Sequence, residues 1–110
     1  MLDIAIQLMK ENKDEEARNI LIKLIETYPD DADVQFYCAS AHDGLGLESE
    51  AIPYYEKAIS LGIEGSNREK VFVQLGSSQR CIGEYEAALR TLEKGLLEFP
   101  ENRAIQTFCL

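Results

Sequence analysis

The sequence has no tryptophan, one histidine, three prolines and three cysteines, and it is poor in basic residues. Cys38, Cys81 and Cys109 are odd in number, far apart and without a C-x-x-C pair, which argues against a disulfide framework and against a zinc site. No run approaches the roughly 20 apolar residues of a membrane span, and the first ten residues show neither a leading cationic segment nor a small-residue cleavage site. These absences predict reduced thiols and a cytoplasmic protein.

The charge balance restricts the partners. The chain has 20 acidic and 11 basic residues and a formal charge of -9, which repels phosphate backbones and anionic headgroups. Nucleic acid and membrane surfaces are therefore not expected as partners. A hydrophobic content of 45% in 110 residues is enough for one core, so residues 1–110 are expected to form a single domain.

One unit recurs nearly three times along the chain. Apolar residues follow one another at helical spacings of three or four, and no useful length alternates like a strand. Each unit reads as a helix hairpin whose turn falls at Asn12, Gly46 or Gly83, residue types that accept the left-handed conformation at the end of a helix. Four positions repeat after 34 and then 37 residues: Ala17, Leu21, Leu24 and Pro29; Ala51, Tyr55, Ala58 and Ile63; Ala88, Leu92, Gly95 and Pro100.

The pattern predicts an all-α fold of about three helix hairpins. The repeats span approximately residues 1–31, 32–68 and 69–102, and a further helix begins in 103–110. The longer second step predicts an insertion in a loop at 62–67. Helix starts are expected at Asp30 or Asp31, at Ser66 with Glu69 as a capping box, and at Asn102.

The third unit resembles the tetratricopeptide repeat. Its pattern is Phe72-x-x-Leu75-Gly76-x-x-Gln79, then Ala88-x-x-x-Leu92 and Pro100. Short acidic bacterial proteins of this family look similar. The stretch from Gly44 to Gly62 is also similar to a Sel1-type repeat, but the prolines and the 34-residue step favour the tetratricopeptide pattern.

The resemblance implies a superhelix whose first helices line a concave groove that binds a protein or peptide segment. Mapped by the repeat, this predicted groove carries Leu2, Ile6, Met9, Phe36, Ser40, Asp43, Lys70, Val73, Ser77 and Arg80. These residues form rows across the first helices, and the rows do not resemble the Lys/Asn/Arg clamp with which some relatives hold acidic chaperone tails. They fit an apolar or amphipathic segment anchored on Phe36, unless Phe36 and Val73 instead pack against neighbouring helices.

No catalytic, cofactor or metal site is expected. His42 is the single histidine and stands where the repeat places a large aromatic residue, so packing explains it better than catalysis. The acidic clusters lack the ligand spacing of a calcium loop, and the glycines lack that of a phosphate loop. The expected function is a non-catalytic interaction scaffold, and the alternative is a thiol-based redox sensor or enzyme that uses Cys81 or Cys38.

The two ends suggest a second kind of contact. Ile105 and Cys109 repeat Val34 and Cys38 at a separation of 71 residues, so a fourth unit begins near the C-terminus. An apolar end of a solenoid and a shortened first helix predict exposed stacking surface. Either the native protein continues or two copies meet, and a homodimer is one expectation.

Overall fold

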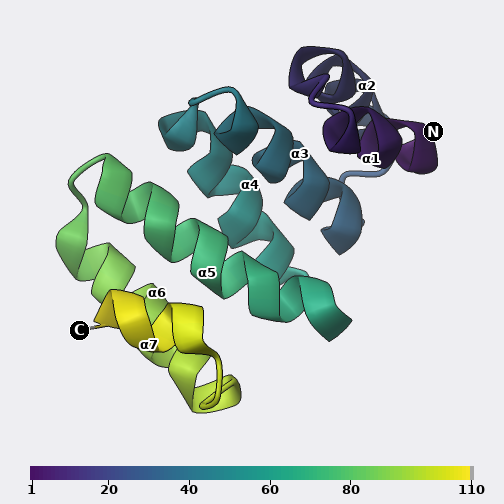
Figure 1. The fold of residues 1–110 in the computed structure, drawn as a ribbon. Helices are drawn as coiled ribbons and strands as arrows, with labels where there is room; N and C mark the ends of the chain where they lie inside the picture. Colours follow the sequence, from purple (N-terminus) through teal and green to yellow (C-terminus); the bar gives the residue numbers. More distant parts are fainter. Residues whose placement is uncertain (110) are drawn as a thin grey trace.

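The computed structural model describes residues 1–109, which form seven helices (Figure 1). Leu110 lies outside the described part, and so do the side chains of Phe108 and of Cys109, the residue that repeats Cys38 in the sequence. The helices are α1 (Leu2–Lys10), α2 (Asp14–Thr27), α3 (Ala32–Gly44), α4 (Glu48–Ser60), α5 (Gly65–Cys81), α6 (Tyr85–Glu98) and α7 (Arg103–Cys109).

The helices form hairpins that stack in sequence order. Each of α1–α2, α3–α4 and α5–α6 packs as a pair, and each following first helix packs on the pair before it. The first helices α1, α3, α5 and α7 lie in one layer and the second helices in another, with the termini at opposite ends (Figure 1). The all-α prediction of stacked hairpins with the start of a further unit is confirmed.

The hairpin turns follow one backbone pattern. Asn12, Gly46 and Gly83 have φ values of 62°, 76° and 84°, as the sequence predicted. The residue that follows each of them donates its N–H to a carbonyl five residues earlier, at distances of 2.8 to 2.9 Å. This is the bond that closes a helix through a left-handed residue.

Two of the predicted caps form and one does not. The Asp31 carboxylate accepts the N–H groups of Asp33 and Val34 at 3.0 and 3.2 Å, and Asn102 Oδ1 accepts the N–H of Ile105 at 2.9 Å. The capping box at Ser66 is wrong, because α5 already begins at Gly65 with Glu64 as its N-cap residue.

The extra residues of the second repeat step lie in a helix. The prediction of a loop insertion is wrong, since α5 has 17 residues against 13 in α3 and is longer at its start. The predicted repeat boundary at 68/69 therefore falls within α5. The added turn places Arg68 where its guanidinium contacts Glu98 at 2.6 Å and lies 5.5 Å from the centre of the Phe72 ring.

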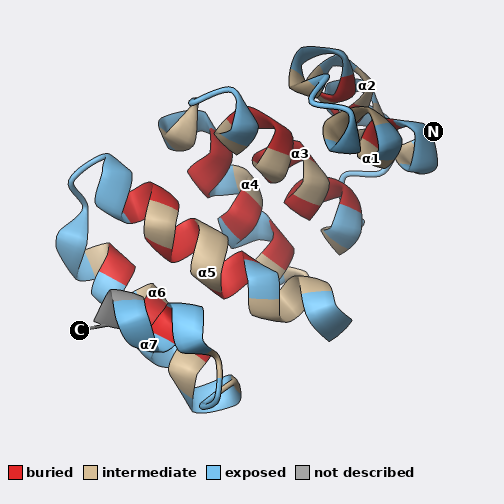
Figure 2. Cartoon of the chain, in the orientation of Figure 1, coloured by how far each residue is buried: buried red, intermediate tan, exposed pale blue. Residues whose placement is uncertain are grey.

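Small residues mark the close contacts between helices. Ala5, Ala17, Ala39, Ala51 and Ala88 are buried, and Gly76 lies where a Cβ atom would come within 2.6 Å of the Leu92 side chain. Figure 2 shows the buried positions concentrated along α3, α4 and α5. A larger cluster joins α3 to α7 and a smaller one joins α1 to α3.

Candidate functional site: the predicted groove

The residues of the predicted groove come from three first helices. Ile6 and Met9 are on α1; Phe36, Ser40 and Asp43 on α3; Lys70, Val73, Ser77 and Arg80 on α5. Spacings of three or four residues put each set on one face of its helix. The three helices lie in the same layer (Figure 1), so the rows run across that layer.

Phe36 is not available as an anchor. Only 2% of its surface is exposed, and its ring centre lies 5.1 Å from that of Tyr37 and 6.1 Å from that of Tyr55. The prediction of an exposed anchor is therefore wrong, and the alternative of packing is the observed state. Val73 is half-buried and packs against the same cluster. The cause is that α5 packs against both α3 and α4, so the apolar side chains between these helices are enclosed.

The outer rows remain accessible. Leu2, Ile6 and Met9 of α1 are half-buried, which leaves part of each apolar side chain in contact with solvent. Lys70 and Arg80 of α5 are exposed. The predicted groove thus offers an apolar edge on one helix and cations on another.

The middle of the predicted groove holds a hydrogen-bonded cluster, here called the Asp43 cluster: Ser40, Asp43, Tyr55, Gln74 and Ser78. Tyr55 OH lies 2.9 Å from Asp43 Oδ2 and 2.8 Å from Gln74 Oε1. Ser40 Oγ lies 3.0 Å from Gln74 Oε1, and Ser78 Oγ donates to the Asp43 carboxylate at 3.1 Å. These contacts join α3, α4 and α5.

Burial perturbs the acidic groups of this cluster. Desolvation raises the pKa of the Asp43 carboxyl, while the hydrogen bonds from Tyr55 and Ser78 act in the opposite direction. Desolvation, followed by the charge of Asp43, raises the pKa of Tyr55. Ionising the phenol beside a carboxylate would bring two negative charges together, so Tyr55 stays a donor.

Sequence reasoning missed Tyr55, Gln74 and Ser78 as polar partners in the predicted groove. Gln74 and Ser78 are four residues apart and so share a face of α5. That pair of polar residues on an otherwise apolar helix face was an available signal. The partners of Gln74 are Ser40 on α3 and Tyr55 on α4, which lie 34 and 19 residues away along the chain, so no local pattern identifies them.

His42 and Cys38 are structural. The His42 ring is buried and stacks on Tyr54 at 5.1 Å, and its Nδ1 lies 2.8 Å from the Cys38 carbonyl oxygen. The same ring nitrogen, Nδ1, is the one that lies 3.8 Å from Cys38 Sγ, so its contact with the carbonyl oxygen leaves it less able to act on the thiol. Burial raises the pKa of the Cys38 thiol to about 12, which leaves very little thiolate at neutral pH. Cys81 is exposed, and the structure gives the redox alternative no support.

Over residues 1–107, whose side chains the structure describes, the His, Cys, Asp and Glu side chains do not gather into a group that could hold a metal ion. Within the same residues, the helices are too short or too polar to cross a membrane.

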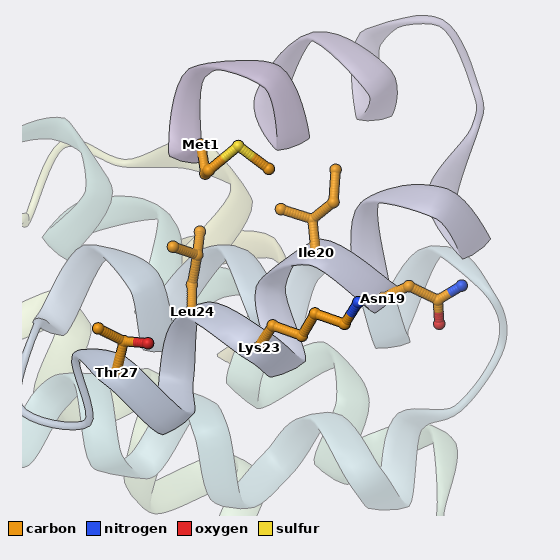
Figure 3. A pocket seen from close by; sticks show the side chains of 6 residues that line it. All are labelled: Met1, Asn19, Ile20, Lys23, Leu24 and Thr27. Carbon is orange, nitrogen blue, oxygen red and sulfur yellow. The ribbon is translucent and has the colours of Figure 1, made fainter.

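A hollow of about 360 Å³ is lined by Met1, which precedes α1, and by residues of α2 (Figure 3). Met1 lies over the Ile20 and Leu24 side chains, while Asn19, Lys23 and Thr27 complete the lining. At the other end of the chain Tyr85 and Leu89, 69% and 46% exposed, stand four residues apart on α6. Apolar surface is therefore open at both ends.

Comparison with known proteins finds the same repeat throughout the chain. A family model described as Tetratrico peptide repeat matches residues 32–109, and a model described as Tetratricopeptide repeat matches residues 1–31. A TPR repeat-containing protein of Methanocaldococcus jannaschii is 30% identical over 95 residues, which cover 78% of this chain and 30% of that relative. The chain thus spans less than a third of the relative's length.

A solved structure shares the fold. The second TPR domain of the human RPAP3 protein, determined by NMR in complex with the HSP70 peptide SGPTIEEVD, superposes with a TM-score of 0.87. The likeness covers 97% of this chain and 87% of that domain at 24% sequence identity. The repeat type predicted from the sequence is confirmed.

Proposed function

Because the chain belongs to the tetratricopeptide repeat family, we propose that it is a non-catalytic scaffold that binds a segment of another protein along the predicted groove. The family and the fold indicate a protein-interaction module, and the RPAP3 domain shows that this fold can hold a peptide. The observation that carries the proposal is the pair of accessible rows on α1 and α5. We place the protein in the cytoplasm, where the unpaired Cys38 and Cys81 would stay reduced.

The accessible rows suggest how the segment is held. Ile6 and Met9 offer apolar surface to one side chain of the segment, and Lys70 and Arg80 stand on the opposite row. Between them the Asp43 cluster supplies polar atoms in place of the aromatic anchor expected from the sequence. A segment with both apolar and polar side chains fits this surface better than a uniformly acidic tail.

The test compares what wild type and groove variants capture. Ile6→Ala and Met9→Ala should each reduce the capture of a bound protein, measured by quantitative mass spectrometry after a pull-down. Ile22→Ala and Leu97→Ala truncate apolar side chains at exposed positions outside the predicted groove and should leave capture unchanged. Bound proteins that survive both groove changes would contradict the assignment.

Self-association is a second candidate, favoured by the apolar row on α6. Leu89 occupies the repeat position of Ile52, which is buried in the larger core cluster. Leu89 itself remains 46% exposed, next to Tyr85 on the same face. A surface that is covered in one repeat and open in the next can pack against a second copy.

Sedimentation equilibrium tests this candidate. Self-association should weaken in the Tyr85→Glu/Leu89→Glu variant, whereas Leu97→Glu changes an exposed leucine elsewhere on α6 and should have no effect. A monomer mass for wild type at high concentration would rule out the dimer.

A further inference from the structure

The Asp43 cluster has more close polar contacts than hydroxyl protons to fill them. Four contacts join its members: Ser40 to Gln74, Tyr55 to Gln74, Tyr55 to Asp43 and Ser78 to Asp43. The three hydroxyl groups supply one proton each. One contact therefore needs a fourth proton from another group.

The contact that lacks a proton is one of the two made by the Tyr55 hydroxyl. Its single hydroxyl proton cannot serve both the Asp43 carboxylate at 2.9 Å and the Gln74 side chain at 2.8 Å. An ionised carboxylate is the stronger acceptor, so it takes the Tyr55 proton. Burial raises the pKa of the Asp43 carboxyl, but the two hydroxyl groups that donate to it favour its charged form, and we take Asp43 as ionised.

The Gln74 amide can supply the fourth proton. A half-turn of the amide exchanges its oxygen and nitrogen with almost no change in shape. Its two N–H groups then meet the two oxygens that face it, Tyr55 OH and Ser40 Oγ, and every contact has one proton. The same turn places the Gln74 carbonyl oxygen on the side away from the cluster.

The outward end of the amide is open to solvent. Gln74 is half-buried, and Arg18 Nε is the one buried side-chain polar atom without a hydrogen-bond partner among the described residues. The outward atom of Gln74 is therefore not enclosed. In this state the cluster, which includes Ser40 and Asp43 of the predicted groove, carries a solvent-accessible amide oxygen and a half-buried carboxylate, and both are acceptors.

We propose that Gln74 and Asp43 select a partner segment that places a cationic side chain, lysine or arginine, at the centre of the predicted groove. This rests on the proposed function. Two adjacent acceptors, one charged, match an ammonium or guanidinium group and repel a carboxylate. The protein's formal charge of -9 attracts the same kind of segment from a distance.

The neighbouring cations do not cancel this preference. Lys70 and Arg80 are exposed, so water and salt screen their charges. Asp43 is half-buried, so its charge acts on a bound group with less screening. The segment's apolar side chains would meet Ile6 and Met9 on α1, which makes the expected partner a basic, amphipathic segment.

The first experiment needs no ligand. In wild type at pH 7.5, NMR should show strong Overhauser effects between the Gln74 side-chain amide protons and the Tyr55 ring protons. Asp43→Asn brings its own N–H donor to Tyr55, so the Gln74 amide should turn back and these effects should weaken. Strong effects in both proteins, or in neither, would overturn the proton assignment.

The second experiment measures the preference with defined probes. Three peptides, acetyl-Gly-Ser-Leu-Ala-X-Ala-Leu-Ser-Gly-amide with X as lysine, norleucine or glutamate, are titrated into ¹⁵N-labelled protein. The lysine peptide should bind roughly tenfold more tightly than the glutamate peptide, with norleucine between them. In Asp43→Asn the difference should fall to about twofold, while Asp33→Asn, an exposed aspartate of the same helix, should keep it.

The outcomes separate the two proposals. Equal affinities for the three peptides, with shifts at Ile6 and Val73, would keep groove binding and overturn the cationic preference. Absence of saturable shifts with all three would contradict the groove function and the preference together. A preference that persists in Asp43→Asn would show that another group produces it and would overturn the role of the cluster.

Discussion

Gly76 is the residue where packing most directly opposes local helix preference. A Cβ atom there would lie 2.6 and 2.7 Å from Cδ2 and Cγ of the buried Leu92. Alanine in place of glycine favours a helix by about 1 kcal/mol, whereas overpacking a core costs about 1–3 kcal/mol. We expect Gly76→Ala to lower the free energy of unfolding by up to about 2 kcal/mol in urea titrations. Ser77→Ala, one residue along the same helix, should change it by less than about 0.5 kcal/mol, and equal effects would contradict this account.

Cys38 links stability to alkaline pH. An unfolded cysteine ionises near pH 8.5, but burial raises the pKa of the Cys38 thiol to about 12. Between these values the folded protein keeps a proton that the unfolded chain releases, so stability is lost as pH rises from about 9 toward 12. Urea titrations should show wild type losing about 3 kcal/mol more than Cys38→Ala between pH 7.5 and 10.5. Parallel losses would show that other groups cause the decline.

At the scale of the helices, α3 depends on its first turn. The Asp31 carboxylate accepts two backbone N–H groups there, and its negative charge lies at the positive end of the helix. Asp31→Ala should lower the free energy of unfolding by about 1 kcal/mol. Asp30→Ala removes the neighbouring, exposed charge and should have little effect. If the two variants lose the same stability, general electrostatics rather than the cap is responsible.

The helices and turns were predictable because local chemistry marks them. Gly46 and Gly83 need positive φ values, and Asp31 and Asn102 carry capping oxygens, so neighbouring residues suffice to place these boundaries. The start of α5 was not predictable in this way. Ser66 has the residue type of a cap, but helix formation continues back to Gly65 and the added turn is held by contacts with α6.

The candidate site was harder to predict than the fold. The repeat places Phe36 on the inner face of α3, but the direction of its ring depends on Tyr37 and Tyr55, and on α5 packing over it. Gln74 has no local signature of its role, since its partners lie on two other helices. The positions of such side chains follow from packing between helices, which periodicity does not encode.

On the scale of the whole molecule, stability is distributed unevenly along the stack. The larger core cluster contains aromatic residues such as Tyr55 and Phe72, whereas the cluster under α1 and α2 is mostly alanine with Leu21 as its largest buried side chain. Only Tyr37 and Tyr54 pack against both clusters among the described residues. Within the described residues, α1 and α2 pack against the rest of the fold mainly through α3, and the core cluster at that contact is the smaller one.

We therefore expect α1 and α2 to open before the rest of the fold. Native-state hydrogen exchange should give their amides smaller opening free energies than those of α3, α4 and α5. Leu21→Ala removes the main side chain of the smaller cluster and should lower protection in α1 and α2 by about 2–5 kcal/mol while sparing α5. Leu92→Ala, in the larger cluster, should lower protection in α4, α5 and α6 and leave that of α1 and α2 nearly unchanged. A uniform loss in Leu21→Ala would mean that the stack unfolds as one cooperative unit, because the shared contacts of Tyr37 and Tyr54 would then transmit the damage across both clusters.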